Sequence, residues 1–257
     1  MNALILAAGF GTRLKPWTNH HPKALVPVEG TPMLERVINK LSEAGFDRIY
    51  INIHHFGDQI IDFVSNKSFP GEIIISDERD EILDTGGALV KVFSSADSPD
   101  DLLVHNVDIL SNAACKDLVN THKESKNDVT LLVSDRKTNR KLLFDEEMRL
   151  SGWLDSSKDL YRGEIKRDTD GIKEFAFSGI YVVGREAAED MERIFGKTKF
   201  PLMDYLLHPQ RKCNVKGYYQ ENLTILDIGK PDALAQASEI LDEIMHCPDD
   251  SSLLKRK

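Results

Sequence analysis

The sequence predicts an α/β fold, in which a doubly wound, mostly parallel mixed sheet of the Rossmann type carries helices on both faces. Two observations support this prediction. The first half of the chain alternates short apolar runs with amphipathic stretches, as repeated βαβ units do. The apolar runs are rich in Ile, Val and Leu throughout, which is typical of strands buried between two helix layers.

The expected elements of this half follow from those patterns. Strands are expected at residues 3–8, 48–53, 72–76, 102–105 and 129–133. Helices are expected between them, at residues 32–44, 58–64, 88–93 and 113–124. In the first helix, Thr31 is the expected N-cap, Pro32 suits the first turn and Gly45 suits the C-terminal cap.

The pattern changes after about residue 137. Apolar runs at 142–144 and 149–154 on either side of an acidic turn predict a hairpin. The polar residues 156–169 that follow predict a loop. The remaining expected elements are strands at 175–183, 213–219 and 224–228 and helices at 187–195 and 231–245. Since no repeat and no Pro- or Gly-rich linker interrupts the chain, we expect a single domain over 1–247 and a polar tail at 248–257.

Composition restricts the class of partner. The 257 residues include 33 Lys and Arg against 42 Asp and Glu, and the net charge of −9 argues against nucleic acid. No apolar run approaches the roughly 20 residues that span a membrane, so no membrane partner is expected. Three scattered cysteines without CxxC spacing predict a reducing, cytoplasmic setting. The oligomeric state stays open.

A glycine loop directly after the first expected strand carries the strongest chemical signal. Gly9 and Gly11 allow a tight turn that brings backbone N–H groups close to a polyanion. Arg13 can form a fork of hydrogen bonds to phosphate oxygens, and Lys23 adds a second positive charge. Leu14 replaces the third glycine of a dinucleotide fingerprint, and no Gly-Lys-Ser/Thr ends the loop as in a Walker A motif. The alternative is an ordinary turn with two surface cations.

The motifs around this loop resemble those of a known family. Leu6 to Thr18 and Pro22 to Leu34 match the pattern LAAGxGTRLxPxT followed by PKxLxPVxGxPML. Shorter matches follow in order at 84–89, 106–108, 177–180 and 227–229. The chain therefore resembles the sugar-1-phosphate nucleotidyltransferases, or nucleotide-sugar pyrophosphorylases, which have a GT-A-like fold. Within the family it is most similar to the short bacterial N-acetylmuramate-1-phosphate uridylyltransferases.

This resemblance implies an enzyme that transfers a nucleotidyl group from an NTP, expected to be UTP, to a sugar-1-phosphate, with release of pyrophosphate. Arg13 would bind the leaving pyrophosphate and Lys23 would neutralise charge at the α-phosphate, which makes both catalytic residues. The implied nucleotide-binding residues are Leu6, Ala7, Ala8, Gly9, Gly11, Thr12, Arg13, Gly86 and Gly87. The implied sugar-binding residues are Asn106, Ser178 and Gly179.

Two aspartates are candidate Mg²⁺ ligands. Asp108 and Asp227 each follow an apolar run, at strand ends where open α/β sheets bind ligands. Carboxylates suit Mg²⁺, which also shares oxygens with substrate phosphates. The alternative is that both only cap strands. Similar proteins have glycine where Val107 stands, and valine resists a positive φ, so the metal site would be displaced if that position were left-handed.

Two other functions stay open. The first is a mannose- or heptose-1-phosphate guanylyltransferase. UTP is preferred here because the Ala8 methyl group stands where many guanylyl- and thymidylyl-transferring relatives have glycine. The second is a non-catalytic regulatory subunit that binds NTP, which Val107 favours and the joint presence of Arg13, Lys23, Asp108 and Asp227 opposes.

Overall fold

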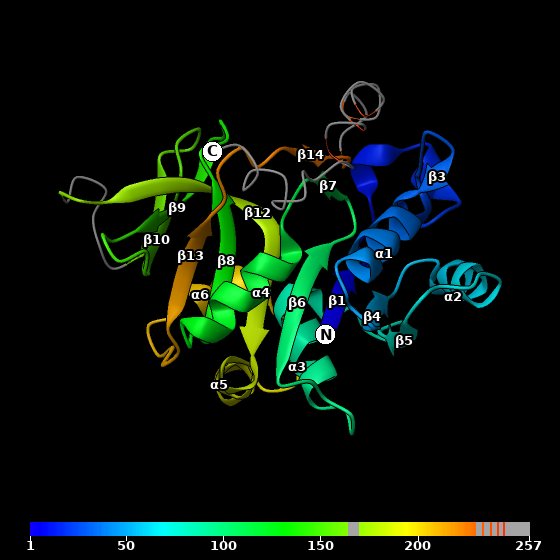
Figure 1. Cartoon of the computed structure of the whole chain (residues 1–257), viewed down its shortest axis with the longest axis horizontal. Coiled ribbons are helices and arrows are strands. Elements are labelled where there is room, and N and C mark those ends of the chain that lie inside the picture. The colour runs from blue at the N-terminus through cyan, green and yellow to red at the C-terminus, as the bar shows by residue number, and fades with distance from the viewer. Residues whose placement is uncertain (164–169, 230–232, 234–236, 238–240, 242–243, 245–257) are drawn as a thin grey trace, which may run out of the picture.

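The computed structural model describes residues 1–163 and 170–229, together with positions 233, 237, 241 and 244. Its centre is a sheet whose parallel part has the strand order β6-β1-β4-β5 (Figure 1). These strands are β1 (Asn2–Leu6), β4 (Arg48–Ile53), β5 (Glu72–Asp77) and β6 (Asp101–Asn106). All four were predicted from the sequence, and their parallel pairing confirms the βαβ arrangement of the first half.

The second half adds antiparallel strands to this core. The long strand β12 (Lys173–Gly184) pairs antiparallel with β6 on one side and with β8 (Val129–Ser134) on the other. Beyond it, β13 (Val215–Tyr219) runs parallel to β8. The sheet is therefore mixed, as predicted, with most of its parallel pairs in the first half of the chain and one more, between β8 and β13, in the second half.

A three-stranded meander extends the sheet from the first three residues of β12. It consists of β9 (Arg140–Phe144), β10 (Leu150–Asp155) and β11 (Leu160–Gly163). The hairpin of β9 and β10 confirms the prediction. The expected loop at 156–169 is wrong over β11, whose exposed side chains gave no periodic signal although its backbone pairs with β10. Residues 164–169 of that loop lie outside the described residues.

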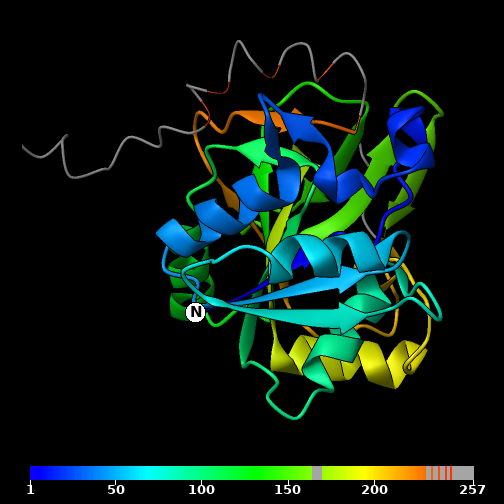
Figure 2. The ribbon, with the colours of Figure 1, turned by 90° about the vertical axis from the view of Figure 1, so that its right-hand side faces the viewer.

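Helices cover both faces of the sheet, as Figure 2 shows with α1 and α2 on one side and α3 and α5 on the other. One layer consists of α1 (Met33–Glu43), α2 (Gly57–Ser65) and α4 (Cys115–Glu124), whose apolar residues share a core cluster. The other consists of α3 (Asp84–Phe93), α5 (Arg185–Phe195) and α6 (Leu202–Leu206). Along β1, Ala3 and Ile5 pack into the first cluster and Leu4 into the second, which confirms the doubly wound fold.

Several helix ends differ from the sequence prediction. Thr31 is not the N-cap of α1, because it pairs in a short ribbon with the strand before it and Pro32 takes the cap position. Helix α3 begins at Asp84, four residues before the predicted start, so the Thr-Gly-Gly segment forms its first turn. The helix expected at 231–245 lies mostly outside the described residues. Within the described part of the chain, no helix has the length and apolar character to cross a bilayer.

Two short antiparallel ribbons lie at one end of the fold. One joins β2 (Pro27–Val28) to β3 (Thr31–Pro32), and the other joins β7 (Ile109–Ser111) to β14 (Ile225–Asp227). Apolar residues of both ribbons share a third core cluster with Ala233, Ala237, Leu241 and Ile244. The second ribbon positions the site described below, because Asp108 immediately precedes β7 and Asp227 ends β14.

A histidine buried in β6 makes the stability of this fold depend on pH. His105 is fully buried, and burial is the main reason that its pKa falls to about 4. Its Nδ1 lies 2.8 Å from the Asn106 carbonyl oxygen. The ring is therefore neutral in the folded protein at pH values where an unfolded chain would protonate it.

We predict that the free energy of unfolding decreases as the pH falls from about 6.5 to about 4. In that range the unfolded chain binds a proton that the folded chain does not, which costs about 2 kcal/mol at pH 5. Urea unfolding at pH 7.5 and pH 5 measures the effect, and His105→Gln should remove this part of it. His20→Gln, at an exposed histidine, is the control. An unchanged pH dependence in His105→Gln would contradict the prediction.

Candidate active site

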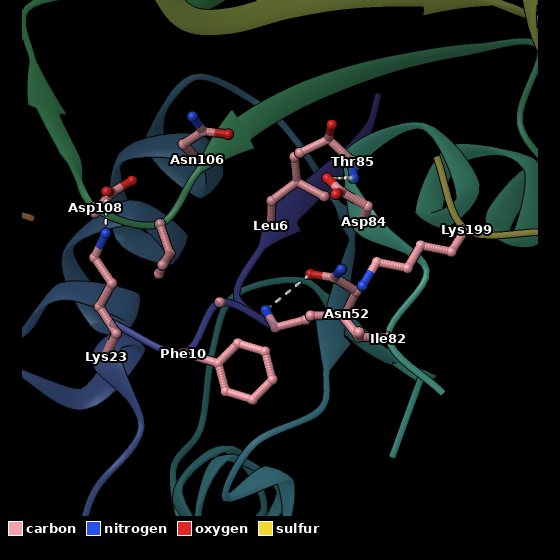
Figure 3. A pocket seen from close by; sticks show the side chains of 13 residues that line it. Leu6, Phe10, Lys23, Asn52, Ile82, Asp84, Thr85, Asn106, Asp108 and Lys199 are labelled. Atoms are coloured by element: carbon pink, nitrogen blue, oxygen red, sulfur yellow. Dashed lines mark hydrogen bonds and ion pairs between the residues drawn. The ribbon is translucent and has the colours of Figure 1, made fainter. Parts of the chain in front are cut away.

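A cavity of about 400 Å³ lies at the carboxyl ends of the parallel strands (Figure 3). Leu6 at the end of β1, Asn52 near the end of β4 and Asn106 at the end of β6 line it. In Figure 3, Lys23 and Asp108 lie on one side of this cavity and Asp84, Thr85 and Lys199 on the other. We call it the nucleotide cavity, after the ligand that the sequence predicts for its glycine loop.

The glycine loop after β1 turns as its sequence requires. Gly11 has a φ of 61°, and a Cβ atom there would lie 2.8 Å from Lys23 Cβ and 2.9 Å from Thr18 Cγ2. The Thr18 hydroxyl donates a hydrogen bond of 2.9 Å to the Gly11 carbonyl oxygen. Any larger residue at Gly11 would be strained and would displace Lys23. Gly9 has open space around it and lines the cavity together with Ala8 and the exposed ring of Phe10.

Asn52 holds the start of this loop through both ends of its side-chain amide. Its Oδ1 accepts hydrogen bonds from the Ala7 N–H at 2.7 Å and the Ala8 N–H at 3.3 Å. Its Nδ2 donates to Glu78 Oε1 at 3.0 Å, and Glu78 Oε2 accepts the Leu83 N–H at 3.0 Å. Burial raises the pKa of Glu78, which is 2% exposed.

This network includes two of the predicted nucleotide-binding residues, Ala7 and Ala8. The amides of Ala7 and Ala8 are bonded to Asn52, so these two N–H groups are not free for a phosphate in this structure. Contact of the two residues with a nucleotide stays a prediction. The sequence analysis missed Asn52 and Glu78. The available signal was a polar Asn inside the apolar run that became β4, because a buried amide must find hydrogen-bond partners.

Four predicted charged residues meet beside Gly229. Lys23 Nζ forms an ion pair with Asp108 Oδ2, and both side chains are mostly buried. A Cβ atom on Gly229 would lie 2.7 Å from Arg13 Nη2, 2.8 Å from Asp227 Oδ1 and 3.1 Å from Lys23 Nζ. The arrangement places two cations and two carboxylates around one point, and it needs glycine there to leave room for them.

The ribbon of β7 and β14 brings the two aspartates together. Asp227 pairs with Ile109 across the ribbon, and the Ile228 N–H donates to the Asp108 carbonyl oxygen at 2.9 Å. Val107 is buried without a positive φ, and its N–H bonds to the Leu6 carbonyl oxygen at 3.2 Å. Valine is therefore accommodated at this position without the left-handed conformation that would have displaced the site.

The two carboxylates fit a Mg²⁺ ion as its protein ligands, with one oxygen from each among the six that the ion binds. Asp108 already holds a cation, the Lys23 ammonium group, at the point where Asp227 approaches. Among the residues that the structure describes, no group of three or more His, Cys, Asp or Glu side chains surrounds such a point. A Mg²⁺ ion here would need its other oxygens from water and substrate phosphates, which is its usual mode of binding in phosphate sites.

Gly86 and Gly87 serve the packing of α3. A Cβ atom on Gly86 would overlap the ring of Phe200, and one on Gly87 would overlap the Thr198 carbonyl oxygen. Both glycines are buried, and neither lines the nucleotide cavity. The part of this motif that does line the cavity is Asp84 and Thr85. Contact of the two glycines with a base therefore stays a prediction.

Asp84 has a backbone conformation that non-glycine residues rarely adopt. Its φ is 60°, and its Oδ1 accepts the Thr85 N–H at 2.7 Å. The Thr85 hydroxyl in turn accepts the Leu202 N–H at 2.8 Å, which fixes α3 against α6. Strained residues of this kind are retained where the surroundings over-determine them, and here the result is a carboxylate directed into the cavity.

The three predicted sugar-binding residues have different environments. Asn106 lines the nucleotide cavity. Gly179 has a φ of 78°, and a Cβ atom there would lie 2.6 Å from Asn106 Nδ2, so glycine leaves room for the Asn106 side chain. Ser178 is 2% exposed, and its Oγ accepts the Ile180 N–H at 3.0 Å within an irregular part of β12. Only Asn106 of this group is placed to touch a ligand in the nucleotide cavity.

A second cavity, of about 680 Å³, opens on the other side of the charged cluster. Arg13 and Asp227 line it, together with residues of the meander and of the segment that precedes β9. We call it the basic cavity, because six of its lining residues carry positive charge: Arg13, Arg136, Arg140, Lys141, Lys158 and Arg162. The sequence analysis missed it, although four cations lie close together between residues 136 and 141.

A glycine loop, two cations and two carboxylates at the carboxyl edge of a parallel sheet define an α/β protein of the NTP-transferase class. The chain belongs to the family described as the MobA-like NTP transferase domain, whose model matches residues 3–167. This confirms the family resemblance drawn from the sequence.

Curated relatives match parts of the chain. Over 90 residues it is 39% identical to an N-acetylmuramate α-1-phosphate uridylyltransferase of Caulobacter vibrioides, covering 34% of this chain and 37% of that protein. Over 245 residues it is 28% identical to a mannose-1-phosphate guanylyltransferase of Mycobacterium tuberculosis, covering 93% of this chain and 64% of that protein. The chain thus spans less than two thirds of the length of these relatives.

Solved structures confirm the fold. A putative glucose-1-phosphate thymidylyltransferase of Bacillus anthracis superposes with a TM-score of 0.75 at 19% identity, over 95% of this chain and 96% of that one. HddC of Yersinia pseudotuberculosis, in complex with GMP-PN, superposes with a TM-score of 0.72 at 22% identity, over 93% and 99% of the two chains. At such identities the likeness concerns the fold alone.

We predict that Asn52→Ala destabilises the protein by about 1–3 kcal/mol, because it leaves two loop amides and Glu78 without their buried partner. NTP binding should weaken as well, since the loop loses its fixed start. Urea unfolding and NTP titration measure the two effects. Asn66→Ala is the control, because Asn66 makes a comparable but exposed bond to the Asp62 carbonyl oxygen. Unchanged stability in Asn52→Ala would contradict the prediction.

Proposed function

We propose that the chain transfers a nucleotidyl group from UTP to a sugar-1-phosphate, N-acetylmuramate-1-phosphate being the first candidate, with release of pyrophosphate. The observation that carries this proposal is the cluster of Arg13, Lys23, Asp108 and Asp227 at the point where the nucleotide cavity meets the basic cavity. A reaction between two bound substrates needs its charged groups at such a junction. The scattered cysteines favour a cytoplasmic setting.

The proposed reaction is an in-line displacement at the α-phosphorus. A phosphate oxygen of the sugar-1-phosphate forms the new bond, and the bond from the α-phosphorus to the bridging oxygen of pyrophosphate breaks. Lys23 and Arg13, which lie together beside Gly229, would stabilise the negative charge on the transferred and leaving groups. Positioning and charge stabilisation account for most catalysis of this type, so no covalent intermediate with the protein is needed.

Mg²⁺ is the proposed cofactor, with Asp108 and Asp227 as its protein ligands. When bound, it would offset the charge of the reacting phosphate oxygens. Lys23 would then share Asp108 with the ion, since the two are paired in this structure. The amides of the glycine loop from Gly9 onward would face the triphosphate, because Asn52 binds only the two amides before them.

The nucleotide cavity offers arguments for two bases. Ala8 lines it with a methyl group, which favours the smaller uracil. Asp84 also lines it, and a carboxylate accepts well from the adjacent N–H groups of guanine, whereas uracil presents one N–H. Asp84 therefore supports a guanylyltransferase acting on mannose- or heptose-1-phosphate as the second candidate function.

Pyrophosphate release tests the proposal. We expect turnover with UTP to exceed that with GTP when N-acetylmuramate-1-phosphate, N-acetylglucosamine-1-phosphate and mannose-1-phosphate are compared by kcat/KM. A tenfold preference for GTP with mannose-1-phosphate would promote the second candidate. Heptose-1-phosphate is tested as a fourth acceptor. If the chain binds an NTP but releases pyrophosphate with no combination of NTP and sugar-1-phosphate, it is a regulatory subunit.

The two-aspartate site makes a separate prediction. Asp108→Asn and Asp227→Asn should each lower kcat by about 10²-fold or more and raise the Mg²⁺ concentration needed for half-maximal rate, because each removes a charged ligand. A Mg²⁺ titration of the initial rate measures both effects. Asp117→Asn, at an exposed residue of α4, is the control. Full activity with an unchanged titration in Asp227→Asn would exclude this site.

A further inference from the structure

The basic cavity holds more positive charge than the single phosphate group of a sugar-1-phosphate with an uncharged sugar would need. Six cations line it against the two carboxylates of Asp155 and Asp227, in a chain whose net charge is −9. The phosphate of the substrate would lie at the Arg13 end, next to Asp227 and Lys23. The remaining cations lie away from that end, on the meander and the segments beside it.

The register of the meander explains why two of these side chains, Arg140 and Arg162, face one space. Trp153 on β10 lies opposite Leu142 on β9 and Arg162 on β11. Asp155 lies opposite Arg140, two residues along the same strands and therefore on the same face. That face is the wall of the basic cavity, and Trp153 and Phe177 supply aromatic surface against which a sugar ring can pack.

Three of the meander cations are already neutralised. Arg140 Nε lies 3.3 Å from Asp155 Oδ2, and a hydrogen bond from the Ser157 hydroxyl, with Arg140, lowers the pKa of Asp155. Lys141 pairs with Glu174 at 3.3 Å, and Arg162 pairs with Asp204 at 2.9 Å. These pairs set the shape of the wall and leave little charge for a ligand.

Arg136 and Lys158 differ from the other three. Both line the basic cavity, and among the residues that the structure describes neither side chain has a carboxylate partner. Both side chains are exposed, so an acceptor whose only charge is its 1-phosphate would leave them in water and gain nothing from them. A carboxylate on the ligand would instead gain charge-assisted hydrogen bonds, bidentate in the case of arginine.

We propose that the basic cavity is the acceptor site for a sugar-1-phosphate that carries a second anionic group, a carboxylate, and that Arg136 and Lys158 bind this group. The inference rests on the proposed nucleotidyl transfer and adds the residues that determine acceptor specificity. These residues would distinguish acceptors whose sugar carries a carboxylate from hexose-1-phosphates whose sugar is uncharged.

Matched pairs of acceptors test the inference. Glucuronate-1-phosphate differs from glucose-1-phosphate only in the oxidation of C6, and N-acetylmuramate-1-phosphate differs from N-acetylglucosamine-1-phosphate by its lactyl group. We expect kcat/KM to be at least ~10-fold higher for the carboxylate-bearing member of one pair, mainly through KM. Glucose-1,6-bisphosphate tests whether a phosphate serves as well. A preference for it over both carboxylates would overturn the carboxylate assignment.

Variants connect the preference to the two residues. Arg136→Gln and Lys158→Gln, alone and combined, should reduce the preference for the acidic acceptor toward unity and leave kcat/KM for the neutral one within about threefold. Lys137→Gln is the control, since Lys137 is an exposed cation next to Arg136 that does not line the cavity. Equal loss for both acceptors in the double variant would overturn the proposal, as would no preference in the wild type.

Binding distinguishes failure of this inference from failure of the proposed function. Calorimetric titration of the intact chain with the four acceptors measures affinity without turnover. Tighter binding of an acidic acceptor that is lost in the double variant supports the site even if no pyrophosphate is released. Release of pyrophosphate with neutral acceptors, together with equal binding of all four, would support the transferase and reject the acidic acceptor.

Discussion

The amide side chain of Asn52 is the interaction on which the rest of the site depends. It is buried at the carboxyl end of β4, and it bonds at once to the loop after β1 and to Glu78 in the segment that leads to α3. The loop after β1, the end of β4 and the segment that leads to α3 all line the nucleotide cavity. Because a buried amide without partners is costly, the segments keep a fixed spacing as long as Asn52 is satisfied.

The two cavities divide the charge of the molecule unevenly. In the nucleotide cavity, Lys23 and Lys199 are matched by Asp84 and Asp108. In the basic cavity the cations are in clear excess. This excess of cations between low-dielectric walls attracts a small anion, although the net charge of the chain is −9.

Much of the fold could be predicted, because the core strands are uninterrupted apolar runs whose burial on both faces shows in composition. The meeting of Arg13, Asp108 and Asp227 could be predicted too, because the glycine loop and the strand ends that contain them lie at the same edge of the sheet. Their roles in binding and catalysis stay predictions. Strand β11 could not be predicted, because only its backbone pairs and its side chains are mostly exposed. The packing of Gly86 against Phe200 was hidden for a different reason, since the partner lies far along the chain.

The basic cavity escaped the sequence analysis because its residues belong to separate segments. Arg136 precedes the meander, Lys158 lies in the turn between β10 and β11, and Arg13 follows β1. Strand pairing in the meander and the position of the ribbon of β7 and β14 bring these residues to the wall of the basic cavity. Motif reading finds residues that are close in sequence, whereas this site is defined by register.

The meander joins the main sheet over a short length, where Lys173–Phe175 of β12 pairs with Phe144–Leu142 of β9. The strands that carry the glycine loop and Asp108 form their own ladder, on the far side of β12. Insertions or exchanges within the meander would therefore leave that ladder intact. Under the proposed function, changes in this module would alter the contacts to the sugar and leave the residues proposed for phosphate chemistry in place.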